Sequence, residues 1–317
     1  MYTATALGEL LIDFTDAGTS PAGQKLFERN AGGAPANVLS AMSRLGHQCA
    51  FIGKVGQDMH GDFLRRTLED EGIDCRGLVS DPDTFTTLAF VELDGAGDRT
   101  FSFARKPGAD TRLAPDELDR DVIRDSRIFH VGSLSLTDEP ARSATLEALD
   151  CARAAGCALS FDPNYRANLW PSKEAASEQI RSVMGRMDLV KLSDNECELA
   201  CGISDPEQAA AAILAEGPSV VAVTLGGSGA YVRCADGGRY VEGFPAKVVD
   251  TTGAGDSFWG GFLSAFAESG LAPEDVTVER AASFARFGCA VAHFCVEGRG
   301  AIPAMPTREQ VEGLLAS

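Results

Sequence analysis

The middle of the chain reads RIFHV at residues 127–131, PARSATLEALDCARAA at 140–155 and ALSFD at 158–162. The two short runs are apolar, which predicts buried strands, and the longer segment between them has the apolar spacing of a helix. The alternation continues with a helix at 173–187, a strand at 189–192, helices at 195–201 and 207–216, and a strand at 220–225. Strands joined by helices of this length predict right-handed crossovers and a mainly parallel sheet with helices on both faces.

The N-terminal part of the chain adds to this sheet and also departs from its rhythm. It predicts a first strand at 4–14, a helix at 36–45, a strand at 49–55 and a helix at 60–71. Strand-like runs at 86–93 and 99–105 flank the turn sequence DGAGD at 94–98, which indicates a hairpin. We therefore expect one three-layer α/β/α domain over residues 1–317, with a small β lid built from about 14–31 and 86–105.

Composition excludes several classes of protein. Of 317 residues, 44% are hydrophobic and 23% are charged, which is typical of a globular domain. The 46 acidic and 28 basic residues give a formal net charge of −18, which argues against nucleic-acid binding. We expect no membrane span and no secretory signal. The nine cysteines are odd in number and lack a C-x-x-C pair, so we expect reduced thiols and a cytoplasmic location.

The most informative motif for chemistry is DTTGAGDSF at residues 250–258. Three small residues, Gly253, Ala254 and Gly255, precede an apolar helix, and the amides at a helix start can hold a phosphoryl group. A carboxylate at Asp256 would repel that group unless it had a chemical role. The role that fits is general base, accepting the proton of a hydroxyl that attacks phosphorus.

A second glycine motif, NAGGAPAN at 30–37, also leads into a predicted helix. Gly32 and Gly33 allow the backbone to approach a polar ligand closely, and the Asn37 amide can both donate to and accept from sugar hydroxyls.

Together, in this order and more than 200 residues apart, the two motifs resemble the signatures of the ribokinase-like (PfkB) carbohydrate kinases. The resemblance extends from residue 8 to 303 and implies a ribokinase-like fold. Within the family the chain is most similar to fructokinases, in the segments GELLIDF (8–14), GGAPAN (32–37), DPNYR (162–166), LWPS (169–172) and KLSDNE (191–196).

The resemblance implies a fructokinase that transfers phosphate from ATP to the 6-hydroxyl of fructose, with Asp256 as base and residues 253–255 as anion hole. It implies sugar binding by Asp13, Gly32, Gly33, Asn37, Phe90, Phe103, Arg105, Arg166 and Asp256. It implies ATP binding by Asn164, Lys191, Thr224, Gly226, Gly229 and Gly255.

Metal roles are also implied by the resemblance. Asn195 and Glu198 match the family's N-x-x-E motif, which is linked to Mg²⁺, here through metal-bound water. A monovalent cation such as K⁺, found in some relatives, would be held mainly by backbone carbonyls at Asp250, Thr252, Cys295, Gly298 and Gly300.

Other functions remain open on sequence alone. A 2-keto-3-deoxygluconate kinase or another PfkB sugar kinase would share these motifs, and Arg105 with Arg166 would suit a sugar acid. A sugar-binding protein without catalysis is an alternative from another class. A dehydrogenase is disfavoured because GGSG at 226–229 lacks the G-x-G-x-x-G spacing. The expected partners are a sugar and ATP, and the exposed lid edges predict a homodimer.

Overall fold

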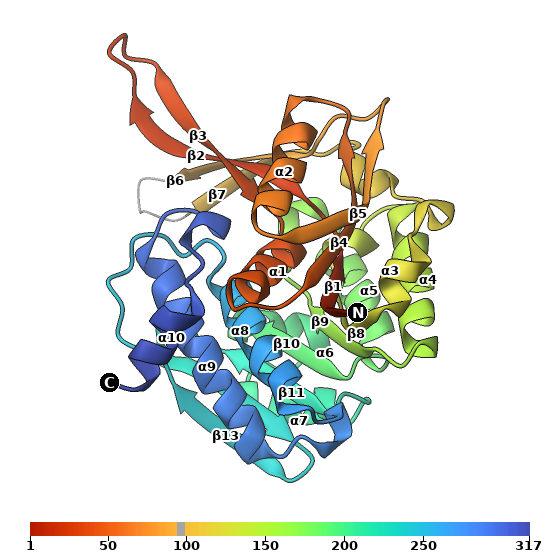
Figure 1. Ribbon diagram of the computed structural model, residues 1–317, viewed down its shortest axis with the longest axis vertical. Helices are drawn as coiled ribbons and strands as arrows, with labels where there is room; N and C mark the ends of the chain where they lie inside the picture. The colour runs from red at the N-terminus through yellow and green to blue at the C-terminus, as the bar shows by residue number, and fades with distance from the viewer. Residues whose placement is uncertain (94–98) are drawn as a thin grey trace.

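The computed structural model describes residues 1–93 and 99–317. Its main sheet has the strand order β13-β12-β11-β10-β9-β8-β1-β4-β5, and every pair from β5 to β11 is parallel (Figure 1). The strands are β1 (Tyr2–Leu7), β4 (Cys49–Gly56), β5 (Ile73–Asp81), β8 (Ser126–Gly132), β9 (Ala158–Asp162), β10 (Leu189–Ser193), β11 (Val220–Thr224), β12 (Gly229–Cys234) and β13 (Gly237–Glu242). The pairs β11–β12 and β12–β13, at one end of this sheet, are antiparallel, so the sheet is mainly parallel and the predicted α/β fold is confirmed.

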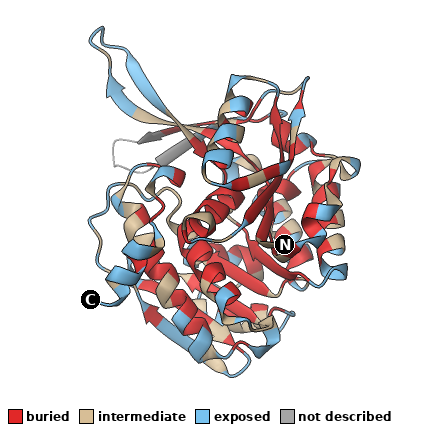
Figure 2. Ribbon diagram, in the orientation of Figure 1, coloured by how far each residue is buried: buried red, intermediate tan, exposed pale blue. Residues whose placement is uncertain are grey.

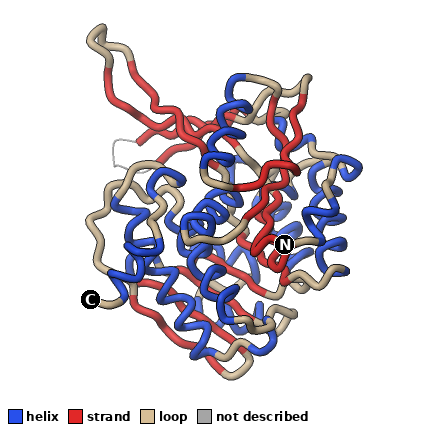
Figure 3. Tube along the Cα trace, viewed as in Figure 1, coloured by secondary structure: helices blue, strands red, loops and turns tan. Residues whose placement is uncertain are grey.

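Helices cover both faces of this sheet (Figure 3). They are α1 (Ala34–Arg44), α2 (Met59–Asp70), α3 (Arg120–Arg124), α4 (Ala141–Ala154), α5 (Lys173–Met184), α6 (Cys197–Cys201), α7 (Pro206–Leu214), α8 (Ala254–Ser269), α9 (Val278–Glu297) and α10 (Arg308–Leu315). Successive strand residues point to opposite faces, so Ile128 packs in the core with α1, α8 and α9, whereas Phe129 packs with α3 to α7. Figure 2 shows the strands buried between these two layers.

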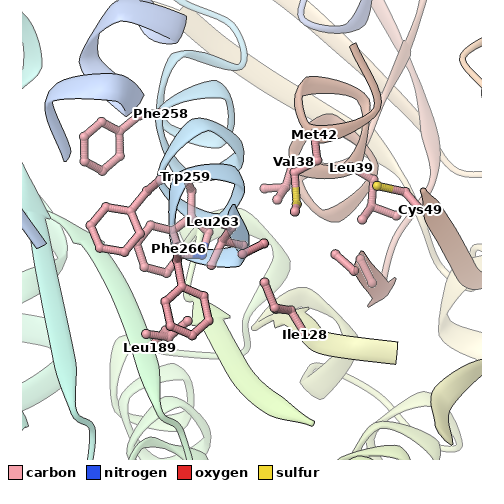
Figure 4. Close-up of a cluster of buried hydrophobic side chains, with 14 of the residues drawn as sticks. Val38, Leu39, Met42, Cys49, Ile128, Leu189, Phe258, Trp259, Leu263 and Phe266 are labelled. Carbon is pink, nitrogen blue, oxygen red and sulfur yellow. The ribbon is translucent and has the colours of Figure 1, made fainter. Parts of the chain in front are cut away.

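The core that fixes α8 on the sheet is aromatic (Figure 4). Trp259 is fully buried and stacks on Phe262, with ring centroids 4.7 Å apart. The Trp259 indole Nε1 donates to Ser160 Oγ at 2.9 Å, so its polar atom is satisfied on β9. Removing a side chain of this kind costs about 3–5 kcal/mol. The start of α8 is therefore held firmly beside the ends of the central strands.

A second, smaller sheet lies beside the main one in the order β3-β2-β6-β7. Its strands are β2 (Leu11–Thr19), β3 (Lys25–Gly32), β6 (Leu88–Leu93) and β7 (Arg99–Ala104). The β2–β3 hairpin projects from the body of the molecule (Figure 1). Strands β6 and β7 pair antiparallel, as expected of a hairpin, and the predicted turn at 94–98 lies outside the described residues.

The prediction of one strand over residues 4–14 was wrong. β1 ends at Leu7 in the main sheet, and the chain enters the smaller sheet as β2 at Leu11. The connection turns where Gly8 packs on Pro35, since a Cβ at Gly8 would lie 2.6 Å from the Pro35 ring. The apolar run hides this break because the strand residues on both sides of it are buried. Asp13 therefore belongs to the smaller sheet.

Candidate active site

The predicted anion hole lies at the start of α8. The helix is capped by Gly253, whose φ of 76° is in the left-handed region that glycine adopts without strain. No described side chain caps this end; the Ala254 amide donates to the Thr251 carbonyl at 3.3 Å, and residues 251–256 line the neighbouring cavity. An uncapped helix start next to a cavity is the arrangement expected of a phosphate-binding turn.

Asp256 lies in the first turn of α8 and is 8% exposed. Its Oδ2 accepts a hydrogen bond of 2.7 Å from Asn37 Nδ2 on α1, a residue 219 positions earlier in the chain. Burial raises the pKa of Asp256 to about 6, and repulsion from Asp162 adds to the rise. The charges of Lys191 and Arg166 and the hydrogen bond from the Asn37 side chain lower this pKa. The group is therefore an ionised proton acceptor near neutral pH, as a general base must be.

A buried ion pair stands next to this base. Lys191 on β10 donates from Nζ to Asp162 Oδ2 at 2.8 Å, and both side chains are almost fully buried. Burial alone would lower the pKa of Lys191, but the carboxylates of Asp162, Glu196 and Asp256 raise it. A Cβ at Gly255 would lie 2.8 Å from Lys191 Nζ, so the ammonium reaches the turn at the start of α8. This places a fixed positive charge beside the predicted phosphoryl position.

The base, the glycine turn and several predicted sugar residues surround one cavity of about 170 Å³. The predicted residues that line it are Asp13, Gly33, Asn37, Phe103, Asn164, Arg166, Lys191, Thr252, Gly253, Ala254, Gly255 and Asp256. Gly32 lies just behind this lining, because a Cβ there would overlap Asp13 Oδ2 at 2.0 Å. The two glycine motifs, far apart in sequence, therefore meet across a cavity that suits a small polar ligand.

Phe90 lies on the opposite side of the smaller sheet from this cavity. Asp13, Ala89 and Phe103 are paired across β2, β6 and β7, so they share the face that meets the cavity. Phe90 follows Ala89 and points the other way, where it stacks on Phe14 with ring centroids 5.2 Å apart. The predicted packing of Phe90 on the sugar does not match this placement, because strand pairing gives Phe90 and Phe103 opposite orientations.

Arg105 also lies outside the cavity lining. Its guanidinium donates to Asp110 Oδ2 at 2.7 Å, to Thr137 Oγ1 at 2.9 Å and to the Leu134 carbonyl at 2.8 Å. Its side chain is 3% exposed and lines a separate groove of about 690 Å³, which does not include Asp256. In this structure Arg105 joins the end of β7 to the main body, and of the two predicted arginines only Arg166 lines the cavity.

Comparisons with known proteins identify the family of this chain. The model of the pfkB family carbohydrate kinases matches residues 2–308. The chain belongs to this family. It is 42% identical over 314 residues to a probable fructokinase-4 of Arabidopsis thaliana, covering 98% of this chain and 95% of that protein.

Two solved structures extend the similarity to the fold. The fructokinase with bound ATP from Xylella fastidiosa has a TM-score of 0.90 and 34% identity, covering 100% of this chain and 99% of that one. The fructokinase from Vibrio cholerae O395 in its fructose-, ADP- and calcium-bound form has a TM-score of 0.88 and 31% identity, with 99% of each chain covered.

In this pfkB-family chain the predicted magnesium residues and several predicted ATP residues follow neighbouring strands of the main sheet. Asn195 and Glu198 come directly after β10, and Thr224, Gly226 and Gly229 follow or end β11. Because β9, β10 and β11 are parallel neighbours, their carboxyl ends form one edge, beside Asp162 and Asn164. These five residues do not line the cavity of Asp256, whereas the other predicted ATP residues, Asn164, Lys191 and Gly255, do.

The residues predicted for a monovalent cation also meet. The Asp250 carboxylate accepts from Thr252 N and Oγ1 at 2.9 and 2.8 Å, and from Gly300 N at 3.0 Å. Cys295 Sγ lies 3.7 Å from the Thr252 carbonyl, and Gly298 N donates to the Cys295 carbonyl. The loop before α8 is thus tied to the segment after α9.

Each helix that the structure describes is too short or too polar to span a lipid bilayer.

Two acidic residues of this site were missed as functional residues. Glu9 lines the cavity and caps α1, and Asp162 holds Lys191. Asp162 ends an apolar strand and precedes Pro163, which is a usable signal for a residue at a sheet edge. Glu9 is an acid inside an apolar run, GELLI, where a buried charge requires a specific reason.

Proposed function

We propose that this protein is an ATP-dependent fructokinase, which converts fructose and ATP to fructose 6-phosphate and ADP. The observation that supports this most directly is the buried Asp256 carboxylate at the uncapped start of α8, in a cavity of about 170 Å³. Similarity over nearly the full length to fructokinases supports fructose as the acceptor.

The proton step follows from the position of Asp256. A sugar hydroxyl in the cavity donates its proton to the Asp256 carboxylate as its oxygen attacks the γ-phosphorus. Asn37 holds Asp256 Oδ2, so the base has a fixed orientation when the sugar arrives. Closure of the smaller sheet over the bound sugar would exclude water, which would otherwise compete as acceptor of the phosphoryl group.

Charge on the transferred group is offset by this chain's own residues. The amides of 253–255 face the phosphoryl from one side, and Lys191, fixed by Asp162, supplies a positive charge beside them. Arg166 lines the same cavity and acts on the same charge.

The metal roles are proposals of the same kind. Glu198 is 61% exposed and pairs only loosely with Lys173 at 3.6 Å, and Asn195 is exposed one turn before it. Accessible oxygen donors fit an ion that reaches the site with ATP and keeps part of its water shell, as Mg²⁺ does. Asn195 and Glu198 would hold this Mg²⁺, which would neutralise phosphate charge. We also propose a K⁺ site between the loop before α8 and the end of α9 with the segment after it, at Asp250, Thr252, Cys295, Gly298 and Gly300.

The acceptor can be tested with an ATP-coupled panel of fructose, 2-keto-3-deoxygluconate, ribose, tagatose and adenosine. We expect the highest kcat/KM with fructose. A higher value for the sugar acid would assign the chain to the 2-keto-3-deoxygluconate kinases instead. Sugar binding without any ATP-dependent product would identify a non-catalytic binding protein.

We further propose one kinase domain over residues 1–317, with the smaller sheet as its lid and as the contact of a homodimer. Strands β3 and β7 are edges of that sheet, and Leu26 and Phe27 on β3 are 43% and 37% exposed. A second copy would cover both features. Sedimentation of the wild type and of Phe27→Lys tests this, since a monomeric wild type would contradict it.

A cytoplasmic location is proposed from the thiols. All nine cysteines are free, and most are buried. Burial raises the pKa of Cys49 and of Cys197 to about 12, which leaves them unreactive. Fractionation of cells that produce the protein would test the compartment.

A further inference from the structure

We infer that Glu9 is a positioning residue of this active site: its carboxyl holds the first turn of α1, and through Asn37 this sets the orientation of Asp256. The inference deepens the proposed sugar-kinase function and rests on it. It concerns a residue in the connection between β1 and β2, which lies outside both glycine motifs in the sequence.

The first turn of α1 depends on Glu9 for its cap. The capping residue is Gly33, which has no side chain to accept from the helix amides. The Ala34 amide donates instead to Glu9 Oε1 at 2.9 Å, in a buried hydrogen bond. The backbone of Glu9 contacts the same turn, because a Cβ at Gly33 would lie 2.3 Å from the Glu9 carbonyl oxygen. Glu9 therefore fixes this turn through both its side chain and its backbone.

The turn leads directly to the catalytic base. The Asn37 amide donates to the Gly33 carbonyl at 2.9 Å, which closes the first turn. From the same residue, Nδ2 donates to Asp256 Oδ2 at 2.7 Å. A shift of the Gly33–Ala34 turn thus moves the side chain that orients Asp256. Misplacement of reacting groups by about 1 Å can cost about 100-fold in rate.

The environment of Glu9 favours the neutral acid. Glu9 is 2% exposed, and Oε2 has no hydrogen-bond partner among the described residues. Burial raises the pKa of Glu9 to about 7, and the negative charge of Asp110 adds to the rise. Hydrogen bonds from the Glu9 and Ala34 amides and the positive charge of Arg105 act in the opposite direction. Other charged groups around the shared cavity are Asp13, Arg166, Lys191 and Asp256. Ionisation above about pH 7 strengthens the hydrogen bond from the Ala34 amide, so the cap is kept in either protonation state, while Oε2 carries charge without a partner among the described residues.

Two substitutions separate positioning from simple stability. Glu9→Ala removes the acceptor of the Ala34 amide. Glu9→Gln keeps an oxygen acceptor and the shape but cannot ionise. The matched control is Asp205→Ala, which removes the exposed cap of α7, where Asp205 accepts from the Gln208 amide at 2.9 Å. Kinetic constants for fructose and ATP are measured from pH 6 to 9, with amide hydrogen exchange of the first turn of α1.

We expect Glu9→Ala to lower kcat/KM for fructose by about 10- to 100-fold, with KM for ATP changed by less than about threefold. Glu9→Gln should recover most of that loss, because its side-chain oxygen can still accept from the Ala34 amide. Exchange in the first turn should be faster in Glu9→Ala and slower again in Glu9→Gln.

The inference is overturned if Glu9→Ala, like Asp205→Ala, loses stability while keeping its kcat/KM. It is also overturned if Glu9→Gln is as impaired as Glu9→Ala. If Glu9→Ala does not fold, Glu9→Asp takes its place, because the shorter side chain withdraws the acceptor from the Ala34 amide; a kcat/KM equal to that of Glu9→Gln would then overturn the inference. A wild type that phosphorylates no sugar would refute the proposed function. In that case, amide exchange in the first turn of α1, compared between the wild type and Glu9→Ala, would still test whether Glu9 caps this helix.

Discussion

Replacing Asp256 by asparagine separates catalysis from stability in this active site. Asparagine has the same shape and can still accept the hydrogen bond from Asn37, but it cannot take a proton from the sugar. General-base catalysis contributes about 100- to 10,000-fold, so we expect kcat for fructose to fall by that factor. ATP binding should change little, because the substitution leaves the backbone of residues 253–255 in place.

The same substitution should stabilise the fold at neutral and alkaline pH. The pKa of Asp256 is raised from 3.8 to about 6 by burial and by Asp162. At about 1.4 kcal/mol per pKa unit, ionised Asp256 costs the folded state about 3 kcal/mol. Because the folded pKa is raised, this contribution to stability is complete below about pH 4 and is lost as the pH rises through 6. Asparagine carries no such cost, so the gain should appear at pH 8 and be nearly absent at pH 4.

The assays are ADP-coupled turnover and urea unfolding at pH 4 and pH 8. Asp205→Asn is the control, since it neutralises an exposed carboxylate that caps α7, where asparagine caps equally well. A variant that keeps kcat within tenfold of the wild type would refute Asp256 as the base. An equal change in the free energy of unfolding at both pH values would refute the argument from the buried charge.

Three further substitutions test the surrounding residues. Lys191→Met should lower the free energy of unfolding by about 3–5 kcal/mol, because it leaves the buried Asp162 carboxylate without the Lys191 ammonium. Unfolding in urea measures this change, and a loss below about 1 kcal/mol would contradict the prediction. Gly255→Val should lower kcat strongly, since even a Cβ at this position would lie 2.8 Å from Lys191 Nζ, and normal turnover would show that the turn tolerates side chains. Phe103→Ala should raise KM for fructose, whereas Phe90→Ala should lower stability alone; equal KM effects would place both rings at the sugar.

The sequence predicted the central sheet well for a physical reason. Strands buried on both faces are short apolar runs, and β9 begins and ends where the pattern indicates, at Ala158 and Asp162. Edge strands lack this pattern, because one side of them meets solvent. β5 mixes buried and exposed residues, and β13 is mostly exposed. Neither strand therefore has the continuous apolar run that predicted the central strands.

The site was predictable where a motif carries its own chemistry, as around Asp256. It was not predictable where the role depends on how distant strands pair. The faces of Phe90 and Phe103 follow from the register of β2, β6 and β7, which no local pattern specifies. The partners of Arg105 and Glu9 likewise lie on other segments, at Asp110 and Ala34, and only the folded chain brings them together.

Asp256 and Glu9 are both buried carboxyls of the cavity, and burial raises the pKa of Asp256 to about 6 and that of Glu9 to about 7. Asp256 must lose its proton to act as the base, so activity should fall as the pH drops below about 6. The Glu9 cap accepts from the Ala34 amide in either protonation state. Both raised pKa values lower stability as the pH rises, so the fold is more stable where its base is protonated and inactive. A site that needs an ionised buried base destabilises its own fold, and the aromatic core beneath α8 offsets that cost.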